Sequence, residues 1–214
     1  NHDWLTPLSS ASVATAWRDC GPALRQVLRF TALACLVGFF HPGLAPLIAN
    51  ELLGPSPLAL GLFTSVLAAG SICGGVILQR RSQQLCRRPA LLLGTSALVT
   101  AVAQLGMAAA TGTASMIPTS LAMAFLIGAG TACLLAGTNL ITQVAVPQVL
   151  RGRMAGLAQV AFLGGGGLSG LLAASLTMVY GLQTCFALLG GIGLVIALWE
   201  LRSRGSQRLE QDRG

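Results

Sequence analysis

Two kinds of residue in this chain could do chemistry: one histidine deep in an apolar run, and a few uncharged polar side chains in other runs. His41 lies well inside the first long apolar run and is followed by Pro42 and Gly43, with Pro46 a turn later. Imidazole titrates near neutral pH, so a histidine suits the binding and release of protons. If the run crosses a membrane, an ionisable group inside it is a functional candidate by default, because keeping it there is costly.

Pro42 and Gly43 can interrupt a helix and leave backbone carbonyl groups without donors, and such carbonyls can line a cavity. Two interpretations of His41 follow. The ring either faces a substrate or proton route, or it donates to a neighbouring helix and contributes only to packing. Glu51, at the far end of the same run, is interpreted as a solvated or loop-pairing group.

Uncharged polar side chains form the second set of candidates. Asn139 and Gln143 stand at i and i+4 and therefore share one face of a helix. They either contact a polar group of a substrate or hydrogen-bond to a neighbouring helix, an interaction worth ~0.6 kcal/mol on average in membranes. The same alternatives hold for Thr64, Ser65 and Gln159. The candidate substrate-binding residues are therefore His41, Thr64, Asn139, Gln143 and Gln159.

The rest of the sequence lacks the patterns of an enzyme or a metal protein. Its six cysteines are scattered singly, without a CxxC pair, so neither a metal site nor a disulfide framework is predicted. The glycine run 164–167 has no Lys or Ser/Thr at the spacing of a phosphate loop. We therefore predict no cofactor, no metal and no enzymatic activity.

The elements that position the candidate residues are predicted to be membrane-spanning helices. The 214 residues are 54% hydrophobic and 9% charged, whereas soluble domains carry roughly a quarter charged residues. No charged residue lies between Arg88 and Arg151, or between Arg153 and Glu200. A span needs only ~20 apolar residues to cross the hydrocarbon layer. The composition excludes a soluble domain and predicts an all-α polytopic membrane protein.

Six transmembrane spans are predicted, with Pro, Gly or small polar residues at most of the breaks. They cover residues 30–49, 58–78, 90–110, 117–143, 154–178 and 182–200. Gly70 and Gly74 form one GxxxG pair, and Gly166 and Gly170 form another. Such pairs let helix backbones approach closely, so close packing is predicted at both.

Arginine sets the predicted orientation. All 13 cationic residues are arginines, and they fall before the first span, after the last and in alternate loops. Because cytoplasmic loops carry the excess of positive charge, six spans with both ends in the cytoplasm place every arginine cluster on one side. The net charge of +7 is therefore interpreted as a topology signal that also touches anionic headgroups, and not as nucleic-acid binding.

Three regions follow from these patterns. Residues 1–29 are predicted to be a cytoplasmic linker, either an amphipathic helix lying at the membrane interface or a flexible connection. Residues 30–200 are predicted to form the six-helix bundle. Residues 201–214 are predicted to be a solvated cytoplasmic tail.

The segment 146–157, VPQVLRGRMAGL, resembles the loop between the tenth and eleventh helices of major facilitator superfamily transporters. It is most similar to the branch of enterobactin exporters and macrolide-efflux proteins, whose pattern is approximately V-P-x-x-L-R-G-R-V-x-G. Met154 replaces the valine of that pattern here. The segments 50–54, NELLG, and 164–170, GGGGLSG, are similar to the exit of the seventh helix and to the eleventh helix of the same branch.

This resemblance covers roughly residues 30–200 and implies the carboxy-terminal six-helix half of a twelve-helix transporter. Each half of such a fold consists of two three-helix units of inverted topology, and the substrate binds between the halves near the bilayer midplane. The resemblance implies that the first, second, fourth and fifth spans face the cavity, which leaves Gln104, on the third, at the periphery. One departure is clear: the loop 75–88 keeps the family's arginines but lacks its aspartate.

The leading functional hypothesis is a secondary active exporter of a small amphiphilic compound, such as a siderophore or drug, with proton coupling left open. No Arg or Lys lies inside a span, as a phosphate or carboxylate carrier would require. The expected partners are the amphiphilic substrate, the lipid bilayer, and an amino-terminal six-helix half or a second copy. The expected location is the plasma membrane, as in a bacterial inner membrane. The alternative is a six-helix subunit or scaffold that does not transport.

Overall fold

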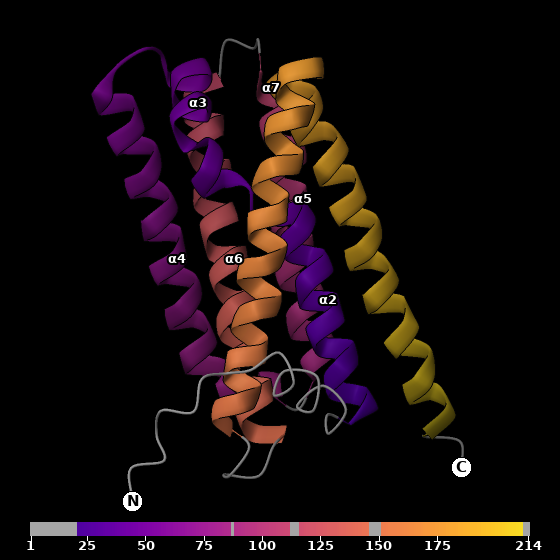
Figure 1. Cartoon of the computed structure of the whole chain (residues 1–214). Helices are drawn as coiled ribbons and strands as arrows, with labels where there is room; N and C mark the ends of the chain where they lie inside the picture. The colour runs from indigo at the N-terminus through magenta and orange to yellow at the C-terminus, as the bar shows by residue number, and fades with distance from the viewer. Residues whose placement is uncertain (1–20, 87, 112–115, 146–150, 212–214) are drawn as a thin grey trace, which may run out of the picture.

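The chain forms, in the computed structural model, a bundle of long helices, and the part that the structure describes contains no strand (Figure 1). Residues 21–86, 88–111, 116–145 and 151–211 are described, with side chains for all of these except 82–86 and 203–211. The helices are α2 (Pro22–Gly38), α3 (His41–Leu53), α4 (Pro57–Cys86), α5 (Pro89–Ala110), α6 (Met116–Ala145) and α7 (Arg151–Gln211). The predicted all-α fold is confirmed.

Proline and glycine set most of the helix boundaries. Helices α2, α4 and α5 each begin at a proline, whose φ suits the first turn and whose missing N–H would have no partner there. Helix α3 ends at Gly54, where φ is +99°. Gly181 has φ 83° and ψ 164°, which interrupts α7. Both angles lie in the region that glycine adopts without steric cost.

Five segments of the described chain are long and apolar enough to cross a membrane, rather than six. The difference lies in α7, because its apolar part, Arg151–Arg202, is a single segment of 52 residues that joins the last two predicted spans. One crossing needs only ~20 residues, and Gly181 divides the segment. Figure 1 shows the two limbs of α7, orange and gold, running in opposite directions. Each limb is therefore one of the predicted spans.

The first span begins earlier than predicted. Helix α2 starts at Pro22, so residues 22–29 of the predicted linker are the first turns of the first span. Leu24 and Leu28 are buried there against the side of α7. Because α7 covers this apolar side, residues 22–29 do not lie as a separate amphipathic helix on the membrane surface. The remainder of the predicted linker, residues 1–20, is outside the described residues.

The last span also extends beyond its predicted end. Helix α7 continues to Gln211, so most of the predicted tail 201–214 continues the helix. Tyr180 and Trp199 are exposed, Tyr180 beside the break at Gly181 and Trp199 near the end of the apolar segment at Arg202. At ~1.5 Å per residue they lie roughly 28 Å apart along the axis, close to the thickness of the hydrocarbon layer. Aromatic residues of this kind favour the two membrane interfaces.

Helices α4 and α6 cross with their backbones in contact. A Cβ atom at Gly70 would collide with the carbonyl oxygen of Phe125, and one at Gly128 would collide with that of Leu67. The Ser71 hydroxyl donates across the same crossing to the carbonyl oxygen of Gly128 at 3.2 Å. The close packing predicted at Gly70 and Gly74 is confirmed. This crossing anchors α4 to the rest of the bundle.

The second glycine pair packs differently from the prediction. Gly166 lies against the ring of Phe39, and Gly165 lies against the backbone of Ala32 on α2. Gly170, in contrast, would have nothing within 4 Å of an added Cβ atom. The close approach of α7 to the end of the α2 segment therefore uses the adjacent glycines Gly165 and Gly166.

Candidate functional site

The first span is broken between α2 and α3, at Phe39 and Phe40. In a continuous helix the N–H of residue 42 would donate to the carbonyl oxygen of residue 38. Residue 42 is proline, which has no N–H, so Gly38 loses this donor. Helical bonding resumes where the N–H of Leu44 donates to the carbonyl oxygen of Phe40 at 3.2 Å. Pro42 therefore leaves the carbonyl oxygen of Gly38 without its helical donor at the break, whereas α3 continues through Pro46.

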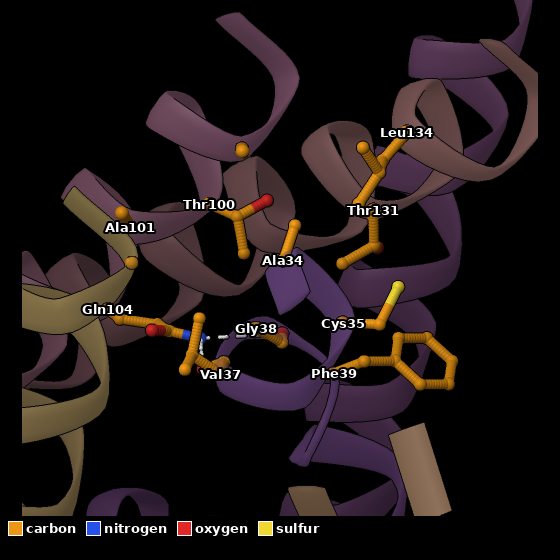
Figure 2. Close-up of a pocket in the computed structure, with 12 residues that line it drawn as sticks. Ala34, Cys35, Val37, Gly38, Phe39, Thr100, Ala101, Gln104, Thr131 and Leu134 are labelled. Atoms are coloured by element: carbon orange, nitrogen blue, oxygen red, sulfur yellow. Dashed lines mark hydrogen bonds between the residues drawn. The ribbon is translucent and has the colours of Figure 1, made fainter. Parts of the chain in front are cut away.

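Gln104 of α5 occupies the place of the missing donor. Its Nε2 donates to the carbonyl oxygens of Val37 and Gly38, at 3.3 and 3.4 Å, and its side chain is 1% exposed. Figure 2 shows these bonds as dashed lines at the end of α2. A small cavity of about 10 Å³, roughly the space of one water molecule, adjoins this point. Its lining comes from α2, α5, α6 and α7 and includes Cys35, Thr100, Thr131 and Gly193.

The resemblance implies that the third span is peripheral to a substrate cavity between two halves, and the structure adds that Gln104 is buried inside this bundle. Residue 104 lies on the side of α5 that faces α2, and its amide fills a bonding need created far away in the chain. A signal for it was present: a glutamine in an apolar span must find a partner, and Pro42 leaves a carbonyl that needs one. Only the packing of α5 against α2 joins these two facts.

His41 is the first residue of α3 and directly follows the break, and its ring is buried. It is 1% exposed, and its Nε2 atom has no hydrogen-bond partner within the described residues. The ring stacks on Phe40, with centroids 4.4 Å apart, and lies 6.2 Å from the ring of Phe186 on α7. The imidazole therefore sits in an aromatic core of this bundle, at the first turn of α3.

Thr64 and Gln159 lie on exposed helix faces. Thr64 is exposed on α4, and its hydroxyl donates within its own helix, to the carbonyl oxygens of Leu60 and Gly61 at 2.8 and 3.1 Å. Only its acceptor capacity is therefore open to another molecule. Gln159 is exposed on the first limb of α7, where its amide can both donate and accept.

Asn139 and Gln143 lie toward the end of α6, with Asn139 half-buried and Gln143 exposed. The buried polar face of α6 is formed by other residues. Thr138 and Thr31 share a hydrogen bond of 2.8 Å between α6 and α2. Sequence reasoning missed this pair, because threonines are common in apolar helices and nothing local indicates which ones meet.

The five predicted site residues do not form one cluster in this bundle. His41 lies in the core, Thr64 and Gln159 lie on separate exposed helices, and Asn139 and Gln143 lie near the end of α6. A larger hollow of about 230 Å³ opens between the first turns of α2 and α5 and the last turns of α6. It is lined by apolar residues such as Val27 and Ile141. None of the five lines either hollow.

The amount of burial differs strongly among the spans. In the most apolar stretch of α5, 56% of the residues are buried inside the bundle, against 17% in α4. Helix α4 contacts its neighbours mainly along the glycine crossing with α6 and leaves most of its circumference open. An open helix of this length and apolarity requires lipid or another protein segment around it.

These features define a class: a polytopic α-helical membrane protein whose first span is broken and whose second is largely uncovered. The model of the Major Facilitator Superfamily matches residues 29–213, most of the chain. The chain therefore belongs to the major facilitator superfamily, whose members are membrane transporters, and the predicted family is confirmed. No curated protein and no solved structure is significantly similar to the chain.

Proposed function

We propose that the chain forms one six-helix half of a secondary active exporter for a small amphiphilic compound. Two exposed helix faces carry this proposal. On α4, the exposed residues Gly61, Thr64, Ser65 and Ala68 stand at i, i+3, i+4 and i+7 and so share one face. This face is smooth, weakly polar and free of charge.

The second face lies on the first limb of α7. Gln159, Leu163 and Gly167 are exposed and recur every four residues along it. An added Cβ atom at Gly164 or Gly167 would have nothing within 4 Å. The face is apolar, with one amide group among aliphatic side chains and glycines.

The chemistry of these faces favours an amphiphile over an ion. Sites for small molecules are mostly apolar, with a few polar groups that fix orientation. Thr64 and Gln159 supply such groups, and the branch resemblance to siderophore and drug exporters agrees with them. A carrier of phosphate or carboxylate would need a cation on these faces. The spans of α4 and α7 carry arginine only toward their ends, at positions such as Arg80 and Arg153.

The proposed partner is an amino-terminal six-helix half of the same transporter, or a second copy of this chain, with the substrate bound between the two halves. The low burial of α4 supports a partner surface at this position. The arginines in the last turns of α4, just before α5 and in the first turn of α7 support cytoplasmic ends in a plasma membrane. Helix α4 ends, and α5 and α7 begin, at the same end of the bundle (Figure 1).

Proton coupling is proposed to use His41. It is the one histidine of the described residues, and its unpaired Nε2 can take up a proton once the break between α2 and α3 admits water. Substitution of His41 by Gln keeps the approximate size and polarity of the side chain and removes its ability to take up a proton. We expect H41Q to abolish the pH dependence of transport while leaving folding intact.

The test uses the full-length protein in proteoliposomes with a pH gradient. Its probes are a panel of lipophilic fluorescent dyes, with inorganic phosphate as the contrasting substrate. We expect dye movement and no phosphate movement, and we expect Gln159→Ala to raise the KM for the dye several-fold, while Ser175→Ala, also exposed on α7, leaves the KM unchanged. If no dye moves and none alters proton flux, the exporter proposal fails and the non-transporting subunit becomes the better account.

A further inference from the structure

At the break in the first span, the residue that removes a hydrogen-bond donor and the residue that replaces it lie on different helices. Pro42 removes the backbone donor of Gly38, and Gln104 supplies a side-chain donor in its place. An unpaired carbonyl in a membrane costs several kcal/mol. The hydrogen bonds from Gln104 therefore stabilise the conformation of the break in which they form. The two bonds from Nε2, 3.3 and 3.4 Å long, are longer than the usual N–H···O hydrogen bond. They can therefore be released at modest cost.

Gly190 of α7 leaves room for the Gln104 side chain. A Cβ atom at Gly190 of α7 would lie 3.1 Å from the Cβ atom of Gln104 and 3.2 Å from the carbonyl oxygen of Ala101. The glutamine is therefore held between the second limb of α7 and the end of α2. With α7 behind it, the amide can reach only toward the break.

Helices α2 and α3 are attached to the bundle in different ways. Helix α2 is bound to α6 through the Thr31 to Thr138 hydrogen bond and to α5 through Gln104. Helix α3 packs through Ile48 and Leu52 into the apolar cluster that also contains Phe186, and no polar bond from a described side chain holds it. The backbone at Phe39 and Phe40 joins the two helices.

We propose that Gln104 is a positioning residue: its amide holds the end of α2 and sets the angle of α3, and with it His41, across a hinge at Phe39 and Phe40. Release of the amide frees the two carbonyls and lets α3 pivot while α2 stays bound to α6. The proposal concerns the resting structure and does not require that the exported compound be an amphiphile.

A double-mutant cycle on the full chain tests the chemical link. Gln104→Leu removes the donor, and Pro42→Ala, at an exposed position, restores a backbone N–H that can reach Gly38. We expect Q104L to lower the melting temperature by roughly 2–4 °C, and by less than half of that in the P42A background. Equal effects of Q104L in both backgrounds would show that the amide does not replace the proline's missing donor, and the proposal would fail.

Gln183 provides a matched control. Its Nε2 donates to the carbonyl oxygen of Ala108, in the last turn of α5, at 3.1 Å. That carbonyl lies where α5 ends, and it also accepts a hydrogen bond from the Thr111 hydroxyl at 2.8 Å, so its bonding does not involve Pro42. Gln183→Leu should therefore lower the melting temperature by the same amount with and without P42A. If P42A rescued Q183L as well, its effect would be general stabilisation, and the link to Gln104 would be lost.

Hydrogen exchange tests the hinge itself. In Gln104→Met, which keeps the length of the side chain without its donor, we expect the α3 amides, beginning with Leu44, to exchange roughly fivefold faster or more. Amides in the middle of α6 should keep their rates. Unchanged exchange in α3, or equal acceleration in both helices, would overturn the hinge. Because neither measurement uses a substrate, failure of the transport assay leaves this result intact, and the reverse also holds.

Discussion

The first span and α6 both cross the bundle and both contain proline, yet only the first span is broken. Pro118 lies in the first turn of α6, which runs unbroken from Met116 to Ala145. An N–H in the first turn has no partner within the helix, so its loss costs nothing there. Pro42 lies in the middle of a span, after the 17 residues of α2, and its missing N–H ends that helix.

The comparison shows that each span satisfies its backbone by a different route. In α6, Thr131 and Thr142 donate to carbonyls one turn earlier in the same helix, so these two hydroxyls are satisfied locally. In the first span, a carbonyl depends on Gln104 of another helix. The backbone of the first span therefore depends on another helix at its break, whereas the backbone of α6 runs unbroken from Met116 to Ala145. Four pairs of substitutions can break or sharpen this contrast.

A proline in the middle of α6 should have the largest effect. Ala136→Pro would remove the donor for the carbonyl oxygen of Ala132, and no neighbouring side chain is bonded there among the described contacts. We expect a loss of ~3 kcal/mol or more in the free energy of unfolding, measured by denaturant unfolding in detergent. Ala136→Gly is the control and should cost only ~1 kcal/mol. A mild effect of A136P would mean that α6 can be broken as easily as the first span.

Glycine substitutions should have the next largest effect, and they should affect α6 and α2 differently. A Cβ atom at Gly128 of α6 would collide with the carbonyl oxygen of Leu67, so Gly128→Ala should cost ~1–3 kcal/mol through forced separation of α4 and α6. In α2, an added Cβ at Gly38 would meet the Thr100 methyl group at an ordinary 3.5 Å. Gly38→Ala should therefore be neutral or slightly stabilising. Thermal unfolding of the two variants measures the difference, and equal losses would contradict the proposed backbone contact.

The hydrogen bond between the two spans should have a smaller effect. Thr138→Val removes the 2.8 Å bond to Thr31 on α2, and we expect a loss of ~0.6 kcal/mol, the average for such bonds in membranes. Thr142→Val is the control, because that hydroxyl donates within α6, to the carbonyl oxygens of Thr138 and Asn139. Denaturant unfolding should find T142V less damaging than T138V.

Removal of Pro118, in the first turn of α6, should have the smallest effect. Pro118→Ala leaves the first turn of α6 with an N–H that needs no helical partner, so its free energy of unfolding should change by less than ~0.5 kcal/mol. For Pro42→Ala, in the first span, the change in the free energy of unfolding should differ between the chain with Gln104 and the Q104L variant. A large effect of P118A would show that proline position within the helix does not explain the contrast.

Much of the fold could be predicted from local pattern. Long apolar runs, arginine clusters and the turn residues between them predict the helices, and the family follows from a short loop motif and is confirmed. The ends were predicted less well. Leu24 and Leu28 stand among arginines and read as part of a surface segment, but α7 covers them. Burial of this kind depends on a partner that lies far away in the chain.

The candidate site was harder to predict than the fold. His41 and the break beside it were recognised from the sequence. The ionisable ring of His41 and the missing N–H of Pro42 are properties of single residues, so no distant partner is needed to see them. Whether the ring faces a cavity depends on what surrounds it, and the structure surrounds it with Phe40 and Phe186. Gln104 was set aside because its span was expected at the periphery, although a peripheral helix still has an inner face.

The sequence by itself determined that this chain spans a membrane and where its first span can be interrupted, because hydrophobicity and the missing N–H of proline are properties of single residues. Tertiary structure alone decided how the break is satisfied. The donor at Gln104 and the carbonyls at Val37 and Gly38 meet only because α5 packs against α2, with Gly190 leaving room for the glutamine. A hydrogen bond between helices depends on their relative position, and that position results from the packing of the whole bundle.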